Sequence, residues 1–71
     1  MPNGYQEFRC WSPVYGCEMV RMSMTDDNGS EFFIMIEADQ GRRWRDAREK
    51  AVFALRTAIA QGLEPGEVFA Q

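Results

Sequence analysis

No histidine occurs among the 71 residues of this chain. Histidine is the commonest general base at neutral pH and the usual activator of a serine or cysteine nucleophile. The carboxylates Glu31, Glu37 and Asp39 do not replace it, because nothing in their spacing indicates an acid–base pair. The sequence therefore predicts that the protein is not an enzyme.

Cysteine is also scarce. Cys10 and Cys17 are too few for a disulfide framework, and without histidine they do not complete the usual zinc-ligand set, so we expect no metal and no cofactor. Their pairing stays open. By strand alternation Cys10 shares a face with Phe8 and Cys17 shares a face with Met19, so a directly opposed pair needs a bulge. In a reducing cytoplasm both thiols would instead stay free.

Long hydrophobic runs are absent. No apolar stretch approaches the roughly 18 residues that cross a bilayer. The first five residues, Met1 to Tyr5, have neither the basic start nor the apolar stretch of a secretory signal. We therefore expect a cytoplasmic protein with no membrane partner.

The chain is short, and we expect residues 1–71 to form a single small domain. Apolar residues make up 45% of it and aromatic residues 13%, which is too much for a disordered polar segment. A core of this size supplies only about 3–5 kcal/mol, and a partner subunit often adds the remainder. A homodimer is therefore an expectation of the sequence.

The first half of the chain has the alternation of β-strands. Residues 5–11 predict one strand, residues 12–16 a turn, and residues 17–25 a second, half-buried strand with Val20, Met22 and Met24 on one side. The segment 26–29, Asp-Asp-Asn-Gly, then indicates a hairpin.

The loop length of this hairpin decides which faces meet. A two-residue loop would place Met24 opposite Phe33, whereas a three-residue loop with a left-handed Gly29 places Met24 opposite Phe32. The second register also pairs Met22 with Ile34 and Val20 with Ile36, and it gathers the more apolar set on one face. We predict this second register, which leaves Phe33 and Met35 on the outer face of the sheet.

From residue 44 to residue 61 the period becomes helical, with an apolar stripe of Trp44, Ala47, Ala51, Leu55 and Ala58. Gly62 is the expected helix stop. Residues 68–70 read equally as a short edge strand or a loose tail. The predicted fold class is α+β: a three-stranded antiparallel β-meander followed by one long amphipathic α-helix, with the short C-terminal strand left open.

Charge is distributed unevenly. Residues 42–56 contain six of the eight basic residues and two acidic ones, a net charge of +4, whereas the remaining residues contain two basic and nine acidic ones, a net charge of −7. Basic groups in a first helical turn oppose the helix dipole. Two explanations stay open: an anionic partner, or a ladder of ion pairs at a spacing of four. The ladder would consist of Arg42–Asp46, Arg45–Glu49 and Asp46–Lys50.

Residues 45–51, Arg-Asp-Ala-Arg-Glu-Lys-Ala, follow strands and resemble the C-terminal half of a double-stranded RNA-binding domain. The resemblance covers about 35 residues and implies that the basic helix start grips phosphates. Trp44 stands where that family has a lysine, the family's first helix is absent, and the net charge of −3 opposes phosphate binding. Nucleic-acid binding is therefore the alternative function rather than the first.

Some apolar residues have no place in the predicted core. Phe53 lies opposite Trp44 on a helical wheel. Trp11 and Tyr15, beside Pro13, form an aromatic turn that reads equally as a binding loop or as a lid on the small core. Apolar surface that the core does not use is typical of an interface. The residues predicted to bind a partner are Trp11, Tyr15, Phe33, Met35, Arg42, Arg43, Arg45, Arg48 and Phe53.

These features favour a non-enzymatic protein-binding module. The classes that fit are a small subunit or adaptor and a small inhibitor, encoded by a phage or mobile element, of a host defence complex, such as an anti-CRISPR protein. The inhibitor class rests on size and type alone.

Overall fold

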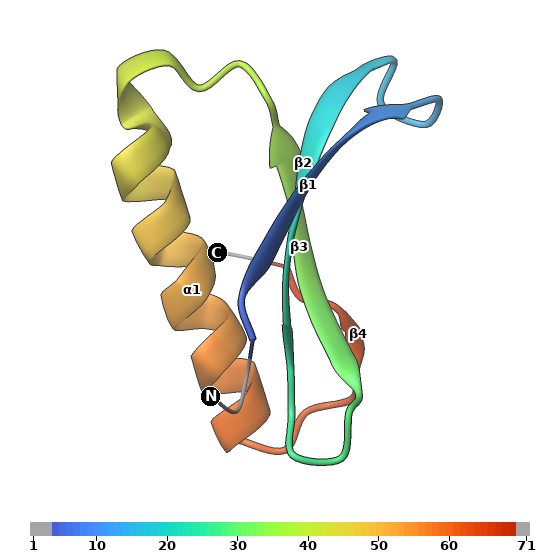
Figure 1. Cartoon of the computed structure of the whole chain (residues 1–71), viewed down its shortest axis with the longest axis vertical. Coiled ribbons are helices and arrows are strands. Elements are labelled where there is room, and N and C mark those ends of the chain that lie inside the picture. Colours follow the sequence, from blue (N-terminus) through green and yellow to red (C-terminus); the bar gives the residue numbers. More distant parts are fainter. Residues whose placement is uncertain (1–3, 70–71) are drawn as a thin grey trace.

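The computed structural model describes residues 4–69 and has the expected α+β architecture (Figure 1). Three strands form an antiparallel meander, a 3₁₀ turn and one helix follow, and a short strand ends the described chain. The elements are β1 (Gln6–Ser12), β2 (Cys17–Thr25), β3 (Glu31–Glu37), η1 (Gly41–Arg43), α1 (Trp44–Ala60) and β4 (Gly66–Glu67). The strand order in the sheet is β1-β2-β3-β4. Within the described residues no helix is long and apolar enough to cross a membrane.

The turn between β2 and β3 has the predicted three-residue loop. Asp26 donates its backbone N–H to the carbonyl of Ser30 at 3.0 Å, and Gly29 donates to the carbonyl of Asp26 at 3.0 Å. Gly29 has a φ of +81°, a left-handed conformation that glycine adopts without strain. The Asp26 carboxylate accepts the backbone N–H groups of Asn28 and Ser30, both at 2.9 Å, and so fixes the loop.

This loop sets the predicted register. Met24 lies opposite Phe32, and Met22 lies opposite Ile34. Alternation then turns one apolar set from each strand toward α1, where Leu55 and Met22 are fully buried. The buried residues that form the core are Val20, Met22, Met24, Phe32, Ile34, Ala38, Ala51, Leu55 and Ala58. Burial of each large member contributes about 1.5–3 kcal/mol.

The helix ends at the predicted glycine. Gly62 has a φ of +68° and donates its N–H to the carbonyl of Ile59 at 3.1 Å, and Leu63 donates to Ala58 at 3.1 Å. These bonds satisfy carbonyls that the last turn leaves without helical partners.

The open question about the C-terminal segment is decided in favour of a strand, which lies two residues earlier than residues 68–70. Gly66 and Glu67 of β4 pair in parallel with Phe32 and Phe33, and the N–H of Val68 donates to the carbonyl of Phe33 at 2.7 Å. Ala70 lies outside the described residues. β4 therefore pairs with the start of β3 at one edge of the sheet, and β1 forms the other edge.

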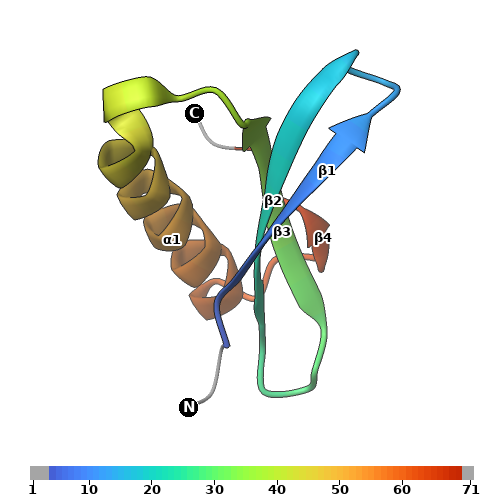
Figure 2. The ribbon, with the colours of Figure 1, turned by 45° about the horizontal axis from the view of Figure 1, so that its top comes forward.

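The helix and the sheet are not parallel. Figures 1 and 2 show that α1 and the β1–β2 hairpin diverge toward the start of the helix, so the two arms form a V. The helix packs on β2 and β3, which leaves the helix-facing side of β1 uncovered near the hairpin end.

Candidate functional site

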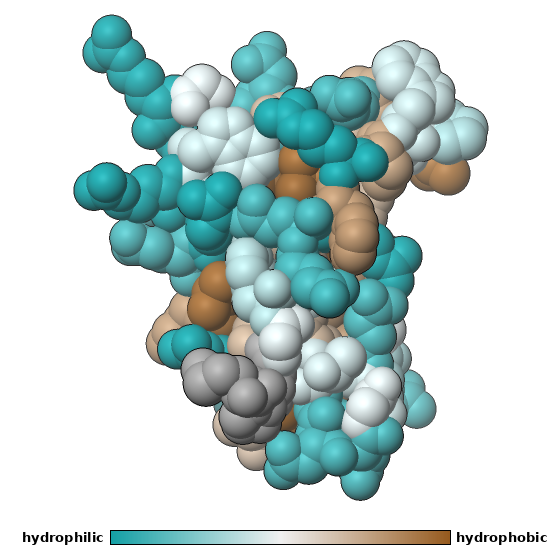
Figure 3. Space-filling model, viewed as in Figure 1, coloured by the Kyte–Doolittle hydropathy of each residue, from teal (hydrophilic) through white to brown (hydrophobic). Residues whose placement is uncertain are grey.

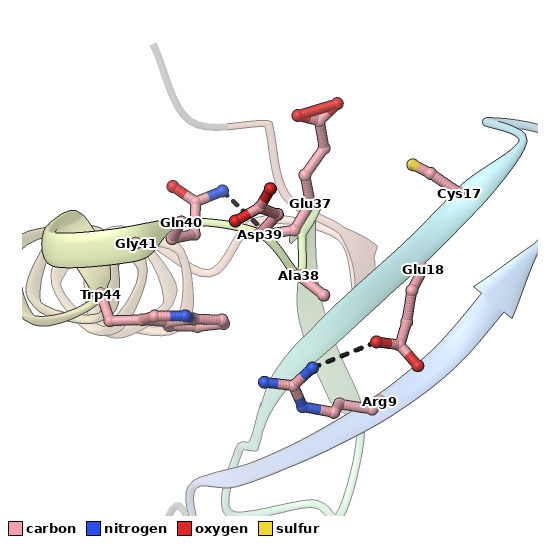
Figure 4. Close-up of a pocket in the computed structure, with 9 residues that line it drawn as sticks. All are labelled: Arg9, Cys17, Glu18, Glu37, Ala38, Asp39, Gln40, Gly41 and Trp44. Atoms are coloured by element: carbon pink, nitrogen blue, oxygen red, sulfur yellow. Dashed lines mark hydrogen bonds and ion pairs between the residues drawn. The ribbon is translucent and has the colours of Figure 1, made fainter.

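A hollow lies in this V, between the β1–β2 hairpin and the start of α1. It has a volume of about 630 Å³ and is bordered by the hairpin on one side and by the segment from Glu37 to Trp44 on the other. In Figure 4, Arg9 and Glu18 form an ion pair of 3.1 Å on the hairpin wall, and Trp44 projects from the opposite wall. Figure 3 shows hydrophobic surface at the floor of the hollow between charged side chains. The hollow is an open groove with one aromatic wall.

The chemistry of the groove is that of a charged surface. Glu18 and Asp39 line it, and Cys17 and Glu37 border it from the start of β2 and the end of β3. Among residues 4–69 no three side chains of the ligand types Cys, Asp and Glu come together to hold a metal ion. Cys10 and Cys17 are both unpaired thiols, and they lie opposite Met19 and Ser12 on the outer face of the sheet.

A second, smaller hollow of about 350 Å³ adjoins the groove and contains a polar network between β1 and α1. The Glu7 carboxylate accepts two hydrogen bonds from the Arg48 guanidinium and one of 2.7 Å from the Tyr5 hydroxyl. The bonds from Arg48, and then the bond from Tyr5, lower the pKa of Glu7 below its ordinary value. Burial, together with the neighbouring Glu7 carboxylate, raises the pKa of Tyr5. Arg48, predicted as a binding residue, thus has an intramolecular partner.

The predicted ion-pair ladder forms only in part. Lys50 contacts Asp46 at 3.1 Å, but within residues 4–69 Arg42 and Arg45 make no ion pair. Arg43 is exposed, as are Arg42 and Arg45, and no side chain caps the start of α1. The structure therefore gathers three arginines, Arg42, Arg43 and Arg45, without carboxylate partners at the beginning of the helix.

Phe53 lies on the solvent side of α1, as predicted, and 73% of it is exposed. It borders a shallow hollow of about 380 Å³ with Arg48, Val52 and Arg56. We call the solvent-facing residues Arg45, Glu49, Phe53 and Arg56, together with the half-buried Val52 beside them, the helix surface. The cluster Arg42, Arg43 and Arg45 lies at its N-terminal end.

Phe33 and Met35 lie on the outer face of the sheet, as the register requires, but both are half-buried. The Arg21 guanidinium stacks over the Phe33 ring at 3.8 Å from its centroid, and Arg21 also pairs with Glu31. The protein's own side chains thus cover part of this face. It is distant from the helix surface because the whole sheet lies between them.

Trp11 and Tyr15 lie at the far end of the β1–β2 hairpin, and 67% and 57% of them are exposed. Neither covers the core. Sequence reasoning missed Phe8, which is 53% exposed on the outer face of β1. The sequence pattern that could have indicated Phe8 is its position between two opposite charges, Glu7 and Arg9, on a strand that lies at the edge of the sheet.

The predicted binding residues therefore occupy three separate places. Phe53 and the arginines lie on or beside the helix surface, Phe33 and Met35 lie behind the sheet, and Trp11 and Tyr15 lie at the hairpin end. No known protein family, no curated protein and no solved structure matches this chain.

Proposed function

We propose that this protein is a non-enzymatic protein-binding module that presents the helix surface to another protein. The observation that carries the proposal is the exposure of Phe53, a large aromatic side chain in the middle of α1 that no described residue covers. An apolar side chain at such a position does not stabilise the protein's own fold, but it gains free energy when a partner buries it.

The surroundings of Phe53 indicate the chemistry of the partner. Arg56 lies beside it on α1, Arg45 lies about two turns closer to the start of the helix, and the cluster there adds Arg42 and Arg43. Arginine and aromatic residues dominate interface energetics, and the charged rim speeds association with an oppositely charged surface. The proposed partner therefore offers an apolar pocket bordered by acidic side chains.

Two cytoplasmic roles would use a surface that binds such a partner. One is a small subunit or adaptor of a larger complex, and the other is a phage- or mobile-element-encoded inhibitor of a host defence complex. Only size and type support the inhibitor. The identity of the captured partner distinguishes the two roles.

A pull-down from the native host, read by mass spectrometry, tests the proposal. The chain offers a matched control, because Phe69 is the same residue type and is also 73% exposed, but lies after β4. We expect one protein to be recovered by the wild type and by Phe69→Ala, and lost with Phe53→Ala. A central aromatic residue typically contributes 2 kcal/mol or more to binding. Equal recovery by all three forms would contradict the proposal.

The alternative function is nucleic-acid binding through the same end of α1, and one observation favours it: Arg42 and Arg45 make no ion pair within residues 4–69. Salt separates the two functions, because phosphate contacts lose affinity steeply as the salt concentration rises. The alternative predicts binding to duplex RNA that weakens strongly as the salt concentration rises from roughly 50 to 200 mM. This binding should depend on Arg45 but not on Phe53.

A further inference from the structure

The outer edge of β1 is open, because β1 ends the sheet and pairs only with β2. Its backbone polarity follows from the hydrogen bonds of the hairpins. The carbonyl of Ser12 accepts the N–H of Gly16, and the N–H of Ala38 donates to the carbonyl of Glu18. The bond to Glu18 shows that the even-numbered residues of β2 bond to β3, so its odd-numbered residues bond to β1. Their partners in β1 are residues 6, 8, 10 and 12. The N–H and C=O groups of Glu7, Arg9 and Trp11 point outward, without a strand partner.

Such an edge accepts another strand, and the sequence of β1 indicates which one. If a second copy pairs antiparallel with Phe8 opposite Phe8, then Glu7 of each copy lies opposite Arg9 of the other. Tyr5 of each copy lies opposite Trp11 of the other. Every cross-strand pair on the groove side is then either opposite in charge or aromatic, and such pairs stabilise sheets.

Other symmetric registers are worse. A centre at Arg9 places two arginines in contact, and a centre at Glu7 places two carboxylates in contact, which is destabilising. Registers without a residue on the symmetry axis are excluded because they would oppose outward-pointing and inward-pointing backbone groups. The Phe8-centred register pairs residues 5–11 of each copy, whereas a centre at Cys10 would place Glu7 opposite Pro13, which has no N–H to donate.

We propose that two copies of this chain form a twofold-symmetric dimer by pairing their β1 edges antiparallel, with Phe8 of one copy opposite Phe8 of the other. The two four-stranded sheets then become one continuous sheet. The hydrogen-bonded residue pairs are Glu7–Arg9 and Tyr5–Trp11, and each occurs twice in the dimer. Together they supply about eight backbone hydrogen bonds, close to the number in an ordinary protein interface. A closed twofold contact also removes the exposed edge that would otherwise favour aggregation.

The side chains at the edge have capacity for the new contacts. The Glu7 carboxylate accepts three hydrogen bonds within the chain, and a carboxylate has about four acceptor sites. Arg9 uses one nitrogen for Glu18, and a guanidinium has about five N–H donors. Both groups can therefore keep their intramolecular partners and reach across the dimer. The proposal does not depend on the proposed function, because the helix surface lies on the other side of α1 from the sheet.

A charge-exchange experiment tests the pairing. Glu7→Lys alone and Arg9→Glu alone each place like charges opposite one another twice in the dimer. We expect the dissociation constant, measured by sedimentation, to rise by about tenfold or more for each variant. Mixing the two variants places opposite charges at both positions, so we expect a heterodimer to form. A wild type that stays monomeric at hundreds of micromolar, or folded variants that do not recover on mixing, would overturn the proposal.

Oxidative cross-linking tests the register without changing charge. The test chain carries Phe8→Cys, with Cys10→Ser and Cys17→Ser to remove the native thiols. In the proposed register the two new thiols lie directly opposite one another in a non-hydrogen-bonded pair, where the Cα atoms are about 4.5 Å apart, within the range of a disulfide. We expect this chain to cross-link to itself under mild oxidation. The matched control keeps Cys10 alone, which in this register lies about 13 Å along the strand from its equivalent. Cross-linking of Cys10 but not of the Phe8→Cys chain would overturn the register.

Discussion

Glu7 on β1 accepts hydrogen bonds from two nitrogens of the Arg48 guanidinium on α1, and 41 residues separate the two along the chain. The main packing of α1 is on β2 and β3. The ion pair therefore connects the helix to the edge strand, and it holds one end of β1 beside α1 while the hairpin end diverges.

This pair predicts a pH dependence of stability. The pKa of Glu7 is lowered in the folded protein, so its contribution to stability is full above the unfolded pKa of about 4.3 and is lost as the pH falls through the folded value. Glu7→Gln should cost about 1 kcal/mol or less at pH 7. In urea unfolding the difference from the wild type should shrink below about pH 4. Asp46→Asn, which alters the exposed pair with Lys50, serves as the control, and an equal effect of this variant would contradict the prediction.

Gly29 should be the most sensitive position of the β2–β3 turn. Its φ of +81° disfavours a Cβ, although no atom lies close enough to clash with one. Gly29→Ala should therefore destabilise the protein by about 1 kcal/mol, purely through backbone strain. Gly29→Asn should cost less, because asparagine tolerates the left-handed region better than alanine does. Equal losses in thermal unfolding would show that strain is not the cause.

Phe53 and Leu55 are two positions apart on α1 and should respond oppositely to truncation. Leu55 is fully buried, so Leu55→Ala should lower the free energy of unfolding by about 2–5 kcal/mol. Phe53→Ala should change it by less than about 0.5 kcal/mol, because the side chain faces solvent. Denaturant unfolding measures both. A large loss with Phe53→Ala would mean that the residue supports the fold and would remove it from the helix surface.

The stacking of Arg21 on Phe33 should contribute measurably to the outer face of the sheet. A cation–π contact at a half-exposed site is worth about 0.5–1 kcal/mol. A double-mutant cycle with Arg21→Ala and Phe33→Leu should return a coupling energy of this size. A coupling energy near zero would contradict this prediction. A partner could then cover the outer face without any loss of cation–π energy.

Local sequence determined much of the architecture. The loop at residues 26–29 set the β2–β3 register because a three-residue loop with Gly29 allows one pairing of the flanking strands. The change from period 2 to period 3.6 located α1, and Gly62 ended it because its left-handed conformation closes the last turn. The exposure of Phe53 followed from the helical period alone.

The partners of individual side chains were decided only by the tertiary structure. Arg48 looked like one of a row of solvent-facing arginines, and its contact with Glu7 depends on the angle at which α1 crosses the sheet. The same crossing angle opens the groove beside Trp44, and the strand order leaves β1 as an open edge. Periodicity fixes which face of an element is apolar, but it carries no information about how far two elements diverge. That divergence depends on long-range packing, in which residues distant along the chain meet.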